Sequence, residues 1–136
     1  MSSDPAAPIR NLEPGDYDLV APVIDAWCGG RPVRGLLPRL FFEHFNTTSF
    51  AIGPKGTIQA FLVGFQSQSQ PGVAYIHFVG VDPALRAQGL ARRLYTHFAG
   101  TVSRLGCSEL HGITSPANVG SIAFHRSMGF ELVPGT

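Results

Sequence analysis

The stretch VDPALRAQGLARRLY at residues 81–95 decides the fold of this chain. Asp82 and Pro83 end a strand, and a helix is expected to begin within the letters ALRAQGL that follow. A glycine costs about 1 kcal/mol against alanine inside a helix, so Gly89 indicates a place where bare backbone is needed. The N–H groups of a first helical turn have no intrahelical acceptors, and the helix dipole adds about half a positive charge there. The stretch therefore predicts an anion site.

The predicted anion is a diphosphate held by backbone contacts. Gly89 and Ala91 are small enough to let its atoms approach, and positive charge is supplied nearby by Arg86, Arg92 and Arg93. The backbone groups expected to hold it are those of Gln88, Gly89, Leu90 and Ala91. The stretch has neither the Gly-Lys-Ser/Thr of a P-loop nor the Gly-x-Gly-x-x-Gly of a Rossmann fold, so both nucleotide-binding motifs are excluded.

Length and composition indicate one globular domain over residues 1–136. Hydrophobic residues make up 44% of the chain, enough to build a core without disulfides or metals. The formal net charge of +1 gives no general attraction to nucleic acid. Cys28 and Cys107 match no metal-ligand spacing, so we expect free thiols and no metal site. No segment reaches the roughly 18 to 20 apolar residues of a membrane span, and the N-terminus lacks a signal peptide's apolar core, so a cytoplasmic protein is expected.

Upstream of residue 81, the pattern changes from helical to extended. After a first strand within residues 8–14, apolar residues at helical spacing predict a helix over 16–27, interrupted by Pro22, and a short helix over 38–45. The β-rich runs at 48–53 and 57–68, separated by Pro-Lys-Gly, predict a hairpin. Residues 73–81 are apolar on both faces, as in a central strand, and Gly80 within them indicates a bulge or a close ligand.

Downstream of the opening stretch, two more helices are expected. The first carries an apolar stripe of Leu90, Leu94, Phe98, Val102 and Leu105, and Gly106 ends it. A strand at 108–115 leads to a second helix at 118–128, closed by Gly129 and Phe130 in the pattern of a Schellman cap. With a last strand at 130–134, the order β-α-α-β-β-β-α-β-α-β predicts an α+β fold, a mixed sheet covered by helices.

Two motifs give the chain a family resemblance. Arg86-Ala-Gln-Gly89-Leu-Ala91 fits the pattern Arg/Gln-x-x-Gly-x-Gly/Ala, and NVGSIAFHRSMGF at 118–130 fits a downstream pattern of Asn, a small residue and Gly-Phe. From about Ile9 to its end, the sequence resembles the GNAT N-acetyltransferase superfamily. The resemblance implies a central sheet whose fourth and fifth strands splay apart, with helices on both faces.

The resemblance also implies that acetyl-CoA binds where the strand at 73–81 splays from the strand at 108–115. Backbone groups of Val79 and Val81 would pair with the pantetheine arm, and an amide near Val79 would polarise the thioester carbonyl. Asn118 would contact the pantetheine through its side chain. The cofactor-binding residues expected on this basis are Val79, Gly80, Val81, Arg86, Gln88, Gly89, Leu90, Ala91, Asn118 and His125.

The catalytic residues depart from the family pattern. Many members have a Tyr as general acid where this chain has His125, which is either an acid or hydrogen-bond donor to sulfur, or a packing residue. One branch has a Glu on the central strand where this chain has Tyr75. His77 lies two residues on, hence on the same face unless a bulge intervenes, and is a candidate proton relay. His111 is its rival, and either histidine could instead belong to the core. The catalytic candidates are His125, His77 and Tyr75.

The resemblance implies direct transfer of an acetyl group to a primary amine of a small molecule, peptide or protein. Because the family's Tyr and Glu are missing, a non-catalytic acyl-CoA-binding module is the alternative. Glu43, His44, Arg31 and Arg34 are candidates for the acceptor side. Only one short strand fits in residues 130–134, so the sheet edge is expected to be incomplete. Either the chain is truncated or disordered at its end, which we favour, or a neighbouring subunit in a homodimer supplies the missing pairing.

Overall fold

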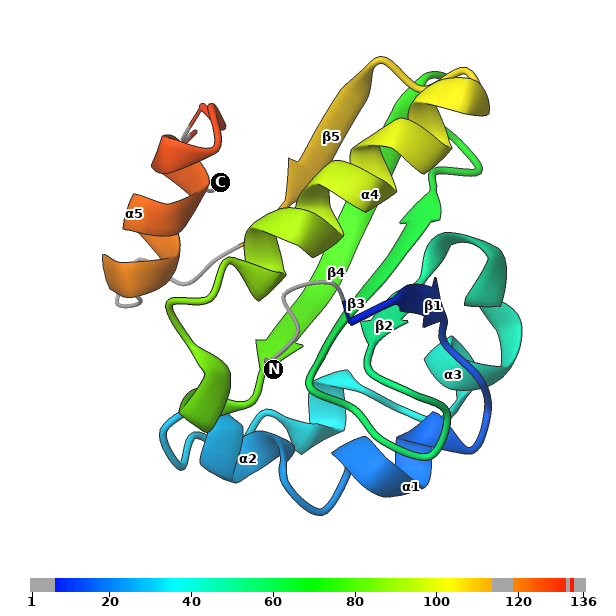
Figure 1. Cartoon of the computed structure of the whole chain (residues 1–136). Coiled ribbons are helices and arrows are strands. Elements are labelled where there is room, and N and C mark those ends of the chain that lie inside the picture. The colour runs from blue at the N-terminus through cyan, green and yellow to red at the C-terminus, as the bar shows by residue number, and fades with distance from the viewer. Residues whose placement is uncertain (1–6, 114–118, 132, 134–136) are drawn as a thin grey trace.

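A mixed five-stranded sheet carries the fold, with its strands in the order β1-β2-β3-β4-β5 (Figure 1). The computed structural model describes residues 7–113, 119–131 and 133. Neighbouring strands run antiparallel from β1 to β4, whereas β4 and β5 are parallel. The strands are β1 (Ile9–Asn11), β2 (Phe50–Ile52), β3 (Ala60–Gln66), β4 (Val73–Val81) and β5 (Glu109–Gly112). The predicted hairpin and the predicted strand at 73–81 are confirmed.

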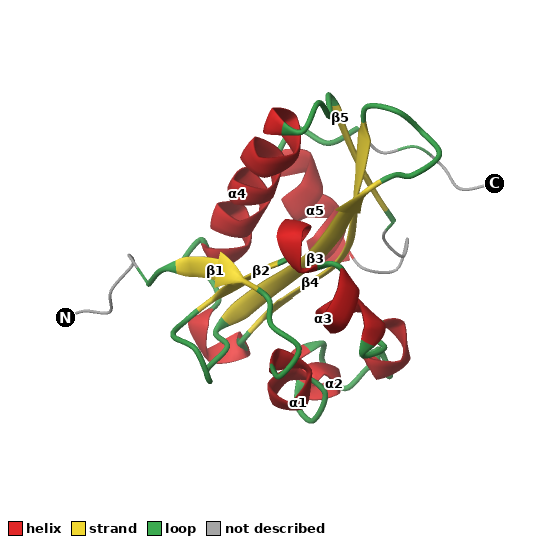
Figure 2. Ribbon diagram, turned by 90° about the vertical axis from the view of Figure 1, so that its right-hand side faces the viewer, coloured by secondary structure: helices red, strands yellow, loops and turns green. Residues whose placement is uncertain are grey.

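Helices cover both faces of the sheet (Figure 2). One face carries α1 (Asp16–Val20), α2 (Ile24–Trp27) and α3 (Leu40–His44), and the other carries α4 (Leu90–Arg104). α5 (Val119–Ser127) packs against α4, and short 3-10 turns occupy Arg34–Leu36, Asn46–Thr48 and Pro83–Leu85. Pro22 separates α1 from α2, as predicted. The layered arrangement confirms the α+β fold class.

Two apolar clusters, one on each face of the sheet, form the core. Alternate residues of β3 point to opposite faces, so Leu62 packs toward α4 while Phe61 and Val63 pack toward α1 to α3. The predicted helical stripe is buried at Leu90, Leu94, Phe98 and Val102. Leu105, its predicted fifth member, is 52% exposed because α4 ends at Arg104.

The register between β3 and β4 shifts at His77. Val63 pairs with Phe78 and Gly64 pairs with Ile76, which leaves His77 as an extra residue without a partner in β3. The bulge reverses the alternation of side chains along β4, so that His77 and Phe78 both lie on the side of α1 to α3. The simple alternation expected along this strand therefore fails at its middle.

Two buried hydroxyls stabilise the backbone opposite this bulge. Thr48 Oγ1 donates to the Gly64 carbonyl at 2.6 Å, and the Gly64 N–H donates to Ser49 Oγ at 3.1 Å. The sequence leaves either a bulge or a close ligand as the reason for Gly80, and the bulge of this strand lies at His77. Gly80 is required by packing, because a β-carbon there would lie 2.5 Å from Cε1 of Phe61.

α4 begins at Leu90, the last residue of the stretch 84–90 within which the sequence predicts its start. Arg86, Gln88 and Gly89 lie in the loop before it, and Gly89 is the N-cap residue with φ of +76°. The glycine is therefore required by a left-handed backbone conformation and not by a place inside the helix. The predicted end of the helix is confirmed, since Gly106 follows it with φ of +98°.

α5 ends in the predicted Schellman cap. The Phe130 N–H donates to the His125 carbonyl and the Gly129 N–H donates to the Arg126 carbonyl, both at 3.0 Å. The strand predicted at 130–134 is not formed at its described residues, Phe130, Glu131 and Val133. Among the described strands, β5 therefore pairs with β4 alone.

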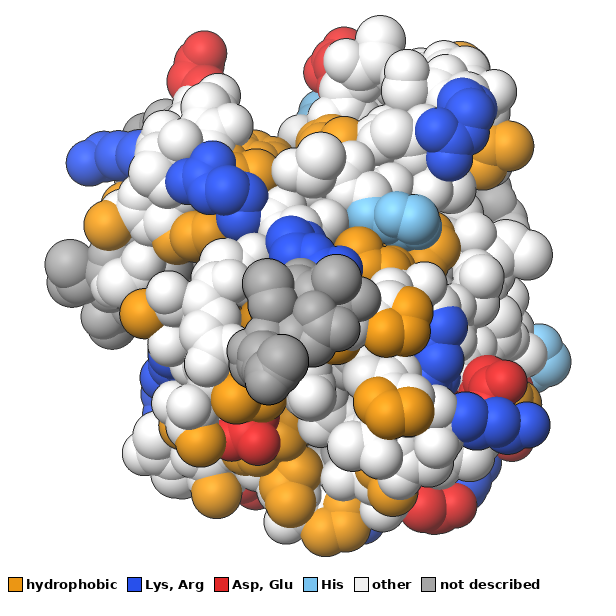
Figure 3. Space-filling model, in the orientation of Figure 1, with side chains coloured by type: hydrophobic (Ala, Val, Ile, Leu, Met, Phe, Trp, Pro, Cys, Tyr) orange, Lys and Arg blue, Asp and Glu red, His pale blue; other side chains and the backbone are white. Residues whose placement is uncertain are grey.

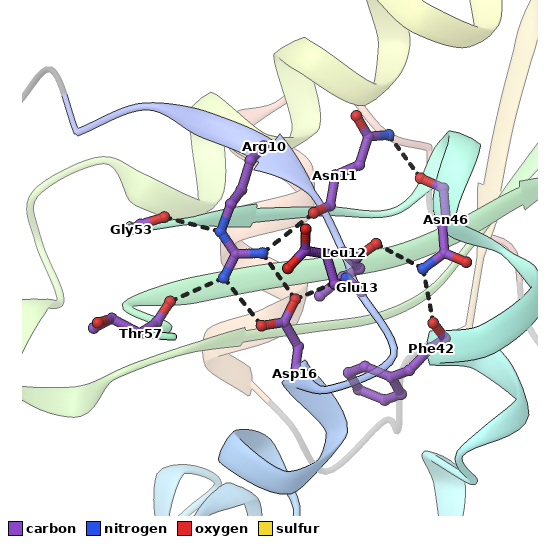
Figure 4. A network of polar contacts seen from close by, with 9 residues as sticks. All are labelled: Arg10, Asn11, Leu12, Glu13, Asp16, Phe42, Asn46, Gly53 and Thr57. Carbon is purple, nitrogen blue, oxygen red and sulfur yellow. Dashed lines mark hydrogen bonds and ion pairs between the residues drawn. The ribbon is translucent and has the colours of Figure 1, made fainter. Parts of the chain in front are cut away.

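An ion pair between β1 and α1 fixes the first edge of the sheet (Figure 4). Arg10 contacts Asp16 through both terminal nitrogens, with Nη1 to Oδ2 at 2.8 Å and Nη2 to Oδ1 at 3.0 Å. The same guanidinium donates to the carbonyls of Gly53 and Thr57, between β2 and β3. Asp16 is 3% exposed, and its Oδ2 also accepts the Glu13 N–H. One cation thus joins three segments that are far apart in the sequence.

Replacing Asp16 with asparagine is expected to lower the free energy of unfolding by about 3 kcal/mol, because the largely buried Arg10 charge loses its partner. Asp18→Asn is the matched control. Its contact with Arg39, at 3.2 Å, is exposed, so its loss is expected to cost less than about 1 kcal/mol. Urea unfolding of both variants measures the difference. Equal losses would show that burial adds nothing to the Arg10–Asp16 pair.

Candidate active site

A cleft of about 730 Å³ opens where β4 and β5 separate. Their parallel pairing ends at Ile76 and Gly112, while β4 continues to Val81. The start of α4 and the facing side of α5 complete the walls. The surface is hollowed between α5 and the rest of the molecule, with Lys or Arg side chains beside the hollow (Figure 3). The expected splaying of the fourth and fifth strands is thus confirmed.

The loop before α4 presents unpaired backbone N–H groups beside the cleft. No described residue accepts a hydrogen bond from the backbone N–H groups of residues 87–92. The backbone has positive φ at Ala87 (+70°) and Gly89 (+76°), and a β-carbon at Gly89 would meet nothing within 4 Å. Arg86 and Arg92 line the same cleft. Open amides, a helix N-terminus and two guanidinium groups together suit a phosphate group.

Most residues predicted to bind the cofactor line this cleft. They are Val79, Val81, Arg86, Gly89, Leu90, Ala91 and His125. Gln88 is exposed outside the lining, and Gly80 lies against Phe61 on the other face of the sheet. Asn118 lies outside the described residues.

His77 enters the cleft from the bulge in β4. Its Nε2 contacts the Leu36 carbonyl, and its ring stacks on Phe41 with centroids 4.4 Å apart. A carbonyl oxygen only accepts, so Nε2 carries the proton and Nδ1 keeps a lone pair. The described residues provide no partner for that nitrogen. His77 is therefore held in the tautomer that a proton acceptor needs.

His125 also lines the cleft, and both of its ring nitrogens are occupied. Nδ1 lies 2.7 Å from the Ser121 carbonyl oxygen, and Nε2 lies 2.7 Å from the hydroxyl of Tyr95. Burial raises the pKa of Tyr95, which is 4% exposed. Sequence reasoning missed Tyr95, although its place four residues after Ala91 puts it on the same face of α4 as the phosphate-site motif.

The other two sequence candidates differ in position. Tyr75 stacks on Phe65, with centroids 5.5 Å apart, and does not line the cleft. Burial raises the pKa of its hydroxyl. His111 lines the cleft from β5, but its Nε2 contacts the exposed Glu109 carboxylate at 3.1 Å. Of the predicted catalytic residues, the cleft thus brings together His77 and His125.

The loop after α2 forms the wall beside His77. Asp25 Oδ1 accepts the N–H groups of Val33 and Arg34 at 2.9 and 2.8 Å, which fixes the loop. Arg31 and Leu36 line the cleft from this loop. The remaining acceptor-side candidates, Arg34, Glu43 and His44, do not line it. Its described charged lining residues are Arg31, Arg86, Arg92 and Glu131, so cationic groups predominate.

The described residues contain no group of three His, Cys, Asp or Glu side chains that could hold a metal ion. Cys28 and Cys107 are free thiols, and burial raises the pKa of Cys28, which lines the cleft. In the part of the chain that the structure describes, every helix is too short or too polar to cross a membrane.

Solved structures with this fold include enzymes in complex with coenzyme A or its analogues. The aminoglycoside N-acetyltransferase AAC(6')-Iy, bound to the bisubstrate analogue CoA-S-monomethyl-acetylneamine, has a TM-score of 0.71 and 21% identity over 95% of this chain and 93% of that one. Diaminobutyrate acetyltransferase EctA from Paenibacillus lautus, bound to L-2,4-diaminobutyric acid and coenzyme A, has a TM-score of 0.71 and 23% identity over 89% of this chain and 73% of that one. At these identities the likeness shows the fold.

Sequence comparison gives a local match and a family match. The L-2,4-diaminobutyric acid acetyltransferase of Vibrio parahaemolyticus serotype O3:K6 (strain RIMD 2210633) is 39% identical over 51 residues, which span 38% of this chain and 28% of that protein's length. The profile of the acetyltransferase (GNAT) family matches residues 18–130, from α1 to the Gly-Phe pair after α5. The chain belongs to the GNAT acetyltransferase family.

Proposed function

We propose that this protein is an acetyl-CoA-dependent N-acetyltransferase that moves the acetyl group directly to a primary amine. The observation that carries the proposal is one cleft with both unpaired backbone N–H groups at the start of α4 and a histidine, His77, whose Nδ1 can accept a proton. A module that only binds acyl-CoA needs the first feature and has no use for the second. Membership of the GNAT family supports the same function.

The proposed orientation of acetyl-CoA in the cleft follows from the position of the lining residues. The backbone of residues 88–91 would hold the diphosphate, with the Arg86 and Arg92 guanidinium groups beside it. The pantetheine arm would follow the free edge of β4 at Val79 and Val81, where β5 no longer pairs. A backbone N–H near Val79 would stabilise the developing oxyanion, an effect worth about 3 to 4 kcal/mol per donor.

His77 acts as the proton acceptor in this proposal. An alkyl amine of pKa about 10.4 is almost fully protonated at pH 7, and its deprotonation costs roughly 4 to 5 kcal/mol there. Nδ1 of His77 takes that proton, directly or through a water molecule, as the amine attacks the acetyl carbon. The proton for the departing thiolate comes from the side of α5, where His125 lies.

The acceptor is proposed to be a small-molecule amine in preference to a peptide or protein. AAC(6')-Iy is an aminoglycoside N-acetyltransferase, and EctA was solved with its substrate L-2,4-diaminobutyric acid, so both relatives in fold act on small-molecule amines. We place the enzyme in the cytoplasm, in keeping with the free thiols of Cys28 and Cys107. A homodimer, the alternative that the sequence leaves open, is tested by sedimentation at increasing concentration.

Acetyl-CoA at about 100 times its Kd is expected to stabilise the protein by about 2.7 kcal/mol, because it binds the folded state alone. Thermal unfolding with and without acetyl-CoA measures this effect. With a panel of small amines, thiol release should exceed the rate without amine. Stabilisation without thiol release would identify a binding module, and the absence of stabilisation would reject the acetyl-CoA site.

A further inference from the structure

We propose that the Tyr95 hydroxyl carries a proton from His125 to the sulfur atom of the departing coenzyme A. The inference rests on the proposed function and deepens it by naming the route of the second proton. Its geometric basis is the contact of 2.7 Å between the Tyr95 hydroxyl oxygen and His125 Nε2, at the wall of the cleft. Tyr95 belongs to α4 and His125 to α5, so the pair joins the two helices that face the cofactor.

The hydrogen bonds of His125 exclude a direct transfer from its ring. The Ser121 carbonyl only accepts, so Nδ1, at 2.7 Å from it, carries a proton. In the neutral ring Nε2 is then an acceptor, and the Tyr95 hydroxyl donates to it. In the charged ring Nε2 also carries a proton, and this proton points at the Tyr95 oxygen. A proton that leaves His125 toward the cleft therefore passes through the Tyr95 hydroxyl.

Tyr95 alone is unsuited to be the acid. Burial raises its pKa above the ordinary value of 10, whereas an alkyl thiol ordinarily has a pKa of about 8.5. A tyrosine that gave up its proton without receiving another would remain as a buried phenolate. The proton given to sulfur must therefore be replaced in the same step.

The imidazolium form of His125 supplies the replacement. As the C–S bond breaks, its electron pair goes to sulfur, the Tyr95 O–H proton goes to sulfur, and the Nε2 proton goes to the Tyr95 oxygen. A free thiol, a neutral tyrosine and a neutral imidazole result, and the ring regains its proton from solvent. Proton transfer from an imidazolium to an alkyl thiolate is downhill, since their ordinary pKa values are about 6.5 and 8.5. The charged residues around the pair are Arg92 and Glu131, which also line the cleft, Arg126, which follows His125, and Arg93, which lies two residues before Tyr95 in the chain.

Tyr95→Phe removes the relay and keeps the ring, which packs on Phe124 with centroids 5.2 Å apart. We expect kcat to fall by about 100-fold, with KM for acetyl-CoA within threefold of the wild type. Tyr17→Phe is the matched control, because Tyr17 also packs on a phenylalanine but does not line the cleft. Its kcat should stay within twofold. If kcat of Tyr95→Phe also stays within twofold while the wild type is active, the relay is wrong.

His125→Gln distinguishes a proton relay through the Tyr95–His125 hydrogen bond from a purely structural role of that bond between α4 and α5. A glutamine amide can accept a hydrogen bond from the Tyr95 hydroxyl, but it has no acidic proton to pass on. A relay predicts that this variant loses kcat as Tyr95→Phe does, and that the double variant is no slower than either single one. If the contact only holds the two helices together, His125→Gln should keep the wild-type kcat. Acetyl-CoA titrations monitored by Trp27 fluorescence confirm that each variant is folded and binds.

Nitrogen-15 spectra of the free protein test the same pair without turnover. The structure predicts that neutral His125 carries its proton on Nδ1 and that the Nε2 signal shows a strong hydrogen bond. In Tyr95→Phe the Nε2 signal should move toward that of an unbonded nitrogen. A wild-type ring with its proton on Nε2, or a signal unchanged in the variant, would overturn the proposed route even if no amine substrate were known.

Discussion

Gly89→Val is expected to weaken acetyl-CoA binding by about 100-fold, which corresponds to about 2.7 kcal/mol. Gly89 has φ of +76°, and the position of its missing β-carbon has no atom within 4 Å. A valine side chain would occupy the space through which the diphosphate approaches the open amides. The loss of one or two charge-assisted hydrogen bonds, at about 1.5 to 3 kcal/mol each, accounts for the expected size.

Gly106→Val provides the matched control for backbone strain. Gly106 follows α4 at its other end, has φ of +98°, and its missing β-carbon also meets nothing within 4 Å. Both variants place a β-branched residue in the left-handed region, so each should lose about 1 to 3 kcal/mol of stability. Only Gly89→Val should lose affinity in a calorimetric titration. Equal affinities in the two variants would place the diphosphate elsewhere.

The parts of the fold that sequence predicts best are those with a strong local pattern. The strand at 73–81 has an unbroken apolar run, and the stripe at Leu90, Leu94, Phe98 and Val102 repeats every four residues over the length of α4. The cap at Gly129 is also predicted by a local pattern, because its conformation depends on neighbouring residues alone. The two short motifs at 86–91 and 118–130 also predict where the cleft lies, because they follow the strand at 73–81 and belong to the two helices in the order expected along the chain.

Other features depend on contacts between segments far apart in the sequence. The bulge at His77 depends on β3 and on the hydroxyls of Thr48 and Ser49, so the pattern of β4 alone does not locate it. The Tyr95–His125 contact spans 30 residues and joins two helices whose packing no local pattern describes. The main errors of sequence reasoning in this cleft thus concern register and side-chain partners, which tertiary structure sets.

His77→Gln is expected to lower kcat by about 100- to 1,000-fold at pH 7, with little change in acetyl-CoA affinity. Glutamine can keep the hydrogen bond to the Leu36 carbonyl through its amide N–H, but it has no basic nitrogen to replace Nδ1. The loss should shrink as the pH rises toward the pKa of the amine substrate, because solvent then removes the proton. Steady-state rates at saturating amine from pH 6 to pH 10 measure both effects.

Two further histidine variants decide whether this loss belongs to His77. His44→Gln, at the exposed end of α3 and outside the cleft lining, should keep the wild-type rate at every pH. His111→Gln tests the rival base, whose Nε2 is engaged with Glu109. Since His111 is exposed on the edge strand while His77 is fixed by Leu36 and Phe41, only His77 has a preorganised free nitrogen among these three. A loss in His111→Gln that disappears at high pH, with a normal rate in His77→Gln, would move the proton acceptor from β4 to β5.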